Sequence, residues 1–128
     1  MKRIGLVTTC CSVAFWLVAG GAADAASIRV KCEKRADRST ISVDGKDLVA
    51  IDGRFRAVVL SGTVQKTADA QAAVGDEVEF DFDSDPGDIA AGATAIPANF
   101  VQGRTVHGKI LDRTGYEVAN STVRCRIR

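Results

Sequence analysis

The chain has 128 residues, with 17 lysines and arginines against 16 aspartates and glutamates, and 46% of its residues are hydrophobic. A formal charge of +1 is too small for a protein that holds nucleic acid through general electrostatics, so we expect no nucleic-acid partner. The length is that of one small domain.

The first 25 residues have the layout of an export signal. Residues 1–3 carry two positive charges, residues 4–21 carry none, and residues 23–25 read Ala-Asp-Ala. This segment resembles a bacterial Sec-type signal peptide with cleavage after residue 25. We therefore expect 26–128 to be a single periplasmic or secreted domain. The alternative is an uncleaved leader, which would then be the only contact of the protein with the membrane.

The two ends of the exported part alternate apolar and polar residues, as strands with one buried face do. In residues 27–33 the inward-facing residues include Cys32, and in residues 122–128 they include Cys125 and Ile127, so each cysteine lies beside apolar neighbours. A pair of cysteines in an exported chain is typical of a disulfide. We predict a Cys32–Cys125 bridge between the first and last strands. Two thiolates and one histidine could not complete a zinc site.

The segments between these ends repeat the same pattern. Strands are predicted over 39–43, 54–60, 63–66, 77–83 and 104–111. Turn signals punctuate them at 44–45, 52–53 and 112–115.

Three connecting segments need a separate interpretation. Residues 67–74 are expected to be a connection, because so short an alanine-rich stretch is marginal as a helix. The apolar residues just before 119 stand at even positions and those just after 122 stand at odd positions. This change within 119–122 predicts a bulge or a break there. Residues 84–98 are predicted to be a long loop, with Ile89, Ile96 and Pro97 exposed as apolar contacts for a partner.

About seven or eight short strands without a long helix predict an all-β protein, an antiparallel β-sandwich with one disulfide joining the first and last strands. Residues 52–59 and 109–118 look like segments of immunoglobulin-like or prealbumin-like sandwiches. This resemblance implies a fold and no activity, because sandwich folds support many unrelated functions.

An acidic segment is one candidate binding site. Carboxylates occupy alternate positions in 81–85, which is how a calcium-binding loop begins. The match then fails, because Pro86 stands where an EF-hand loop needs glycine. A calcium site on Asp83, Asp85 and Asp88 in another geometry is one hypothesis. The alternative is an acidic strand face that is simply exposed to water.

A second candidate is the set of basic residues on the outer faces of the two terminal strands. If these strands are neighbours, one face carries five cations, which are Arg29, Lys31, Arg124, Arg126 and Arg128. Like charges directly opposite each other destabilise a sheet. Either an anionic partner, such as a glycan, relieves this repulsion, or the acidic strand at 77–83 pairs with a basic strand; we favour the second.

Residues for catalysis are sparse. His107 is the only histidine, and no base with an orienting partner accompanies it in the sequence. We therefore expect a non-catalytic interaction or accessory module of the cell envelope that needs no cofactor. Its partner would be an envelope or secreted protein or a glycan. A ligand-binding domain for calcium or an anionic glycan is the alternative, and a small secreted enzyme is the third hypothesis.

Overall fold

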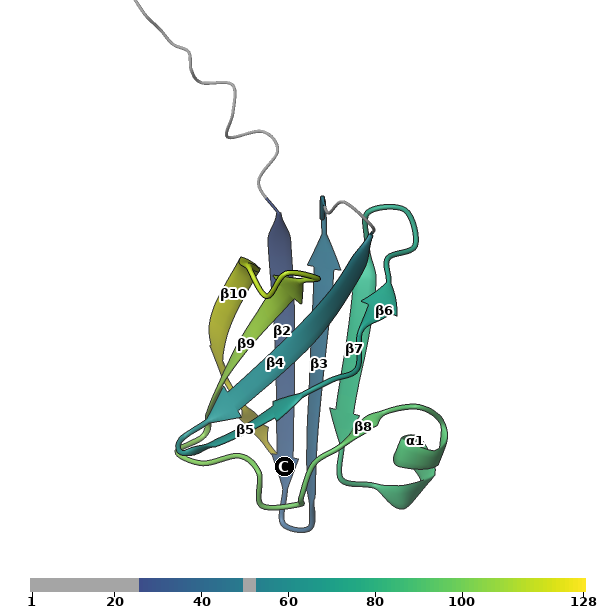
Figure 1. Cartoon of the computed structure of the whole chain (residues 1–128). Helices are drawn as coiled ribbons and strands as arrows, with labels where there is room; N and C mark the ends of the chain where they lie inside the picture. The colour runs from purple at the N-terminus through teal and green to yellow at the C-terminus, as the bar shows by residue number, and fades with distance from the viewer. Residues whose placement is uncertain (1–25, 50–52) are drawn as a thin grey trace, which may run out of the picture.

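The structure, a computed structural model, describes residues 26–49 and 53–128. The predicted leader and part of the predicted turn at 52–53 lie outside the described residues. In the described part the chain is mostly β, and its strands form two five-stranded sheets (Figure 1). The helix found there, α1 (Pro86–Ala90), has five residues, and no helix of this part is long and apolar enough to cross a membrane.

The first sheet, which we call the back sheet, contains both ends of the described chain. Its strands, in spatial order, are β11 (Arg126–Ile127), β2 (Ser27–Arg35), β3 (Arg38–Lys46), β7 (Val78–Asp83) and β8 (Thr94–Ala95). The long neighbours are antiparallel, as predicted. The two short edge strands are parallel to theirs, so the sheet is mixed and not purely antiparallel.

The second sheet, which we call the front sheet, lies across the back sheet (Figure 1). Its strands, in spatial order, are β10 (Glu117–Arg124), β9 (Thr105–Asp112), β4 (Arg54–Ser61) and β5 (Val64–Thr67). A short strand, β6 (Gln71–Ala72), also pairs with β4. β6 lies in the stretch that was expected to be a plain connection.

The inner faces of the two sheets meet in one core. Both contribute alternate residues, as the two-residue period predicts, and the central ones are Val30, Ile41, Val43, Phe80, Phe82, Phe55, Ala57, Val59, Val106 and Ile110. Gly108 permits the close approach of the sheets, because a Cβ there would lie 2.8 Å from Cγ2 of Val30. The absence of a side chain at Gly108 therefore lets Val30 of the back sheet pack closely against the front sheet.

The predicted turn at 44–45 is wrong, because both residues lie inside β3. Gly45 pairs with Ile28 on one side and Val78 on the other. A Cβ at Gly45 would lie 2.5 Å from Cδ1 of Ile110 in the front sheet. The glycine is needed for close packing here and not for a reversal of the chain.

The phase change predicted near the end of the chain is present two residues earlier. The register of β10 on β9 shifts between Glu117 and Ala119. An extra residue in one strand of an antiparallel pair produces such a shift. The bulge returns Val123 to the inner side, where it packs against the core.

The segment from 84 to 98 is more ordered than a long loop. α1 and β8 lie within it, and Ile96 is buried, so the expectation of an exposed contact at Ile96 is wrong. The amide of Ile96 donates to the carbonyl of Asp83 at 3.0 Å, and Ser39 Oγ donates to the carbonyl of Ala98 at 2.6 Å. Ile89 is half-buried and Pro97 is exposed.

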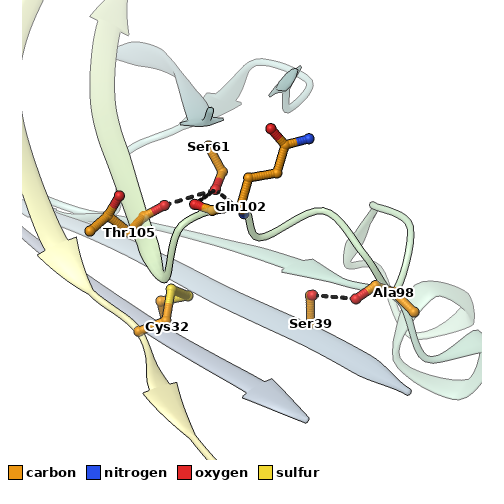
Figure 2. The surroundings of a disulfide bond; sticks show 7 residues. Cys32, Ser39, Ser61, Ala98, Gln102 and Thr105 are labelled. Carbon is orange, nitrogen blue, oxygen red and sulfur yellow. Dashed lines mark hydrogen bonds between the residues drawn. A yellow bond between two sulfur atoms is a disulfide. The ribbon is translucent and has the colours of Figure 1, made fainter. Parts of the chain in front are cut away.

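A second buried serine fixes the chain where it returns to the front sheet. Ser61 Oγ lies 2.8 Å from the carbonyl of Thr105 and 3.1 Å from that of Gln102, and it accepts from the amide of Gln102 at 2.6 Å. Figure 2 shows Ser39 and Ser61 holding the two ends of this return beside the disulfide. Both hydroxyls are fully enclosed, so they stabilise the connection by satisfying backbone groups.

Candidate functional site

The disulfide predicted from strand phase is present and joins the two sheets. Cys32 lies on β2, and Cys125 lies between β10 and β11, with an S–S distance of 1.98 Å and Cα atoms 4.6 Å apart. The predicted strand over 122–128 is therefore two strands, one in each sheet. At Cys125 the chain leaves the front sheet, its amide donating to the carbonyl of Arg104 at 2.7 Å, and it joins the back sheet at Arg126.

This crossing overturns one core residue of the prediction. Ile127 was expected to share the inward face with Cys125, but it is 48% exposed. The two-residue period applies only within one strand, and the crossing at Cys125 interrupts it.

A groove lies beside the disulfide, where the two sheets meet. Its volume is about 460 Å³. Apolar side chains of Val30, Val123 and the half-cystine Cys32 line it, together with the basic residues Lys31, Arg124 and Arg126. Thr40, Ser42 and Glu33 complete its wall. We call this the basic groove.

The structure divides the five predicted basic residues into two groups. Lys31, Arg124 and Arg126 line the basic groove, although they come from three different strands. Arg29 faces Asp44 across the β2–β3 pair and lies outside the groove lining. Arg128 forms an ion pair with Glu33, with its Nε 2.7 Å from Oε2, and is already paired.

Among the described residues, Glu33 is the one carboxylate that lines the basic groove. Besides Arg128, it forms an ion pair with Arg35, whose Nη2 lies 3.1 Å from Oε1, so two guanidinium groups share its charge. Among residues 26–49 and 53–128, no ion pair is found for Lys31, Arg124 or Arg126. The groove is therefore a local region of positive charge with an apolar floor.

The acidic strand does not neutralise the basic strands, so the pairing that we favoured from the sequence is wrong. β7 pairs with β3 and β8, and β3 separates it from β2. The strand partners of Glu79 and Asp81 are Asp44 and Ser42, neither of which is basic. Acidic and basic residues thus occupy opposite edges of one sheet.

Asp83 has a cationic partner within the chain. Arg38 donates to both of its oxygens, from Nε to Oδ1 at 3.0 Å and from Nη2 to Oδ2 at 2.7 Å. The same guanidinium contacts Asp88. Asp83 was expected on the exposed face of its strand but is only 4% exposed, because Arg38 and the start of the 84–98 segment cover it.

The other residue of the hypothetical calcium site has a structural role. Asp85 is the N-cap of α1, and its Oδ2 accepts from the amides of Gly87 and Asp88 at 3.1 and 3.2 Å. Pro86, which conflicted with a calcium loop, is the first helical residue. No group of three or more histidine, cysteine or acidic side chains in the described part of the chain is placed to hold a metal ion.

The pKa values of two acidic residues reflect these surroundings. Burial alone would raise the pKa of Asp83, but hydrogen bonds from Arg38 and from the Asp85 and Ser84 amides outweigh it and hold that pKa below its usual value. The pKa of Asp81 is raised, first by partial burial and then by the nearby charge of Asp44.

His107 lies on the outer side of β9. Its Nδ1 is 2.7 Å from Oγ1 of Thr122 on the neighbouring strand. This contact joins an imidazole to a hydroxyl, and within 26–49 and 53–128 no carboxylate is found hydrogen-bonded to the ring.

Comparisons with protein-family models, with curated proteins and with solved structures find no match to this chain.

Several residues at these sites could not be identified from the sequence. Arg38 and Glu33 looked like ordinary surface charges, because Asp83, which pairs with Arg38, and Arg128, which pairs with Glu33, are distant in sequence. Ser39 and Ser61 carried a weak signal: each has the parity of the buried residues of its own strand. A polar residue on an inward face is a sign that it satisfies buried backbone groups.

Proposed function

We propose that this chain is an exported, non-catalytic binding module that holds an anionic partner in the basic groove. The observation that carries the proposal is the convergence of Lys31, Arg124 and Arg126 on an apolar floor without acidic partners in the described residues. Such a site favours a partner that brings negative charge and some apolar surface. The sequence alone favoured the 84–98 segment as the contact surface for a partner, but its Ile96 is buried in the core.

The proposed location is the periplasm or the extracellular space. A disulfide between the two sheets is consistent with an oxidising compartment. The leader-like composition of residues 1–25 supports export. For the fold, we infer a sandwich of the immunoglobulin-like or prealbumin-like kind, since two sheets share one core.

The experiment is a calorimetric titration of the protein with poly-glutamate, a polyanion of defined chemistry. Lys31→Glu, Arg124→Glu and Arg126→Glu together reverse the groove. The matched control reverses three exposed cations outside it, Lys46→Glu, Arg56→Glu and Lys66→Glu, with the same change in net charge. We expect the groove variant to bind at least about tenfold more weakly and the control to bind as the parent does, with binding weakened by salt.

Equal losses in the two variants would mean that binding follows net charge, and would refute a site at the groove. Unchanged binding in the groove variant would do the same.

A further inference from the structure

The outer edge of β2 lies along the basic groove and is only partly covered. β11 pairs with Glu33 and Lys34 and reaches no further along β2. In the described part of the chain, no other strand pairs with β2 on this side, so the stretch from Ser27 to Cys32 is an open edge. Open edges readily accept a further strand.

The direction of the backbone groups follows from one hydrogen bond. The carbonyl of Lys34 accepts from the amide of Arg128 at 3.0 Å, so the polar groups of Lys34 face the β11 side. Backbone groups alternate between the two sides of a strand. Those of Val30 and Ile28 therefore face the open edge, and Val30 also lines the basic groove.

The opposite edge of the back sheet is blocked at two places. β8 pairs with Phe82 and Asp83 on β7, and Nε2 of Gln71 donates to the carbonyl of Glu79. A side chain from the front sheet thus occupies an edge acceptor that a further strand would need. Of the two edges of this sheet, the one at β2 is available.

The charges around the open edge determine which strand it fits. A second copy that paired β2 with β2 would bring Arg29 and Lys31 against the same cations, which is unfavourable. A second copy that offered β7 would offer an edge that β8 and Gln71 partly occupy. A strand with acidic residues on one face and apolar residues on the other would meet both the cations and the apolar floor.

We propose that the β2 edge from Ile28 to Cys32 binds an extended acidic segment of another protein as an added strand. Its backbone pairs with Val30, its acidic side chains face Lys31, Arg124 and Arg126, and its alternate apolar side chains lie against Val123 and the disulfide. This inference rests on the proposed function, since it identifies the anionic partner of the basic groove as a polypeptide.

The test uses the folded protein and a synthetic peptide of about six residues, the usual length of a strand, in which Glu alternates with Val. The readout is exchange of the Val30 amide, followed by NMR. The control peptide has the same charges but carries N-methyl groups at alternate positions, so that it cannot complete a ladder. Inorganic polyphosphate is the polyanion without a peptide backbone.

We expect the Glu-Val peptide to slow exchange at Val30 about tenfold or more, and the N-methylated peptide and polyphosphate to leave it unchanged. The groove variant with three charge reversals should bind the Glu-Val peptide at least about tenfold more weakly and prefer a Lys-Val peptide.

The two proposals fail in different ways. If polyphosphate binds at the groove and the peptide gives no protection at Val30, the partner is a simple polyanion; the strand-addition proposal falls and the proposed function stands. If neither probe binds, both fall. If sedimentation shows that the protein self-associates and that the groove reversals abolish this, the occupant is a second copy and the strand-addition proposal is wrong.

Discussion

The two edges of the back sheet contrast in how their charges are satisfied. At the β7 edge, Arg38 bridges Asp83 and Asp88, β8 pairs with the end of the strand, and Gln71 caps a carbonyl. At the β2 edge, by comparison, the cations of the basic groove have no acidic partner in the described residues, and most of the strand is not paired with another strand on this side. At the β7 edge the enclosed carboxylate has its cation within the chain, whereas the β2 edge has a longer stretch of unpaired backbone and cations without acidic partners in the described residues.

The interactions that stabilise the two edges also differ. At the β2 edge, the Cys32–Cys125 disulfide joins the strand to the end of the front sheet, and this covalent bond does not depend on how the charges around it are balanced. The β7 edge relies on an ion pair around a buried carboxylate, which needs its partner at all times. We therefore expect the first edge to respond to reduction and the second to respond to acid. Three variants test this difference.

The largest effect is expected for removal of the disulfide by Cys32→Ala with Cys125→Ala. The bridge joins residues 93 positions apart, and the chain-entropy model gives about 4–5 kcal/mol for a loop of that size. The free energy of unfolding, from urea titration followed by circular dichroism, should fall by that amount. A midpoint equal to that of the parent would mean that the sheets hold the β2 edge without the bridge.

The next largest effect is expected for Arg38→Ala. It leaves the carboxylate of Asp83 enclosed without its cation, and a carboxylate kept out of water without a partner is costly, so the free energy of unfolding should fall, by less than on loss of the disulfide. Urea unfolding at neutral pH measures the loss. Arg56→Ala, an exposed arginine of the front sheet, is the matched control and should change stability by less than about 0.5 kcal/mol.

The pH dependence of the Arg38→Ala variant gives a second readout. The folded-state pKa of Asp83 is lowered, so its contribution to stability is present above the unfolded pKa of about 3.9 and is lost as pH falls through the folded value. The parent should therefore lose more stability than the variant on acidification. Parallel curves for the two proteins would show that Arg38 does not cause the shift.

The smallest effect is expected for Asp81→Asn, on the outer face of β7. The pKa of Asp81 is raised by partial burial and by Asp44, so its ionised form is unfavourable in the folded state. That cost is present at neutral pH and is relieved as pH falls through the raised pKa. The variant should be more stable than the parent by less than about 0.5 kcal/mol at pH 7, and equal to it in acid. Destabilisation at pH 7 would mean that this edge uses the charge of Asp81.

Alternation of apolar and polar residues was sufficient to predict the long strands, the inward faces and the disulfide. The signal is local: within one strand every second side chain shares a face, so the parity of Cys32 with Val30 could be read from a few residues. The phase change before Val123 predicted a bulge for the same reason, although it lies two residues earlier than the sequence indicated. Fold class and the residues of the core thus depend mainly on the order of residue types.

The edges were decided only by the tertiary structure. Nothing local distinguishes Arg38, which bridges Asp83 from 45 positions away, from Arg124, which lines an open groove. Strand order is a long-range property, and it placed β3 between the acidic and basic strands and carried the chain from one sheet to the other at Cys125. Because a charge is balanced by its neighbours in space, the sequence alone determined which residues are charged, and the packing of the two sheets determined which charges remain available to a partner.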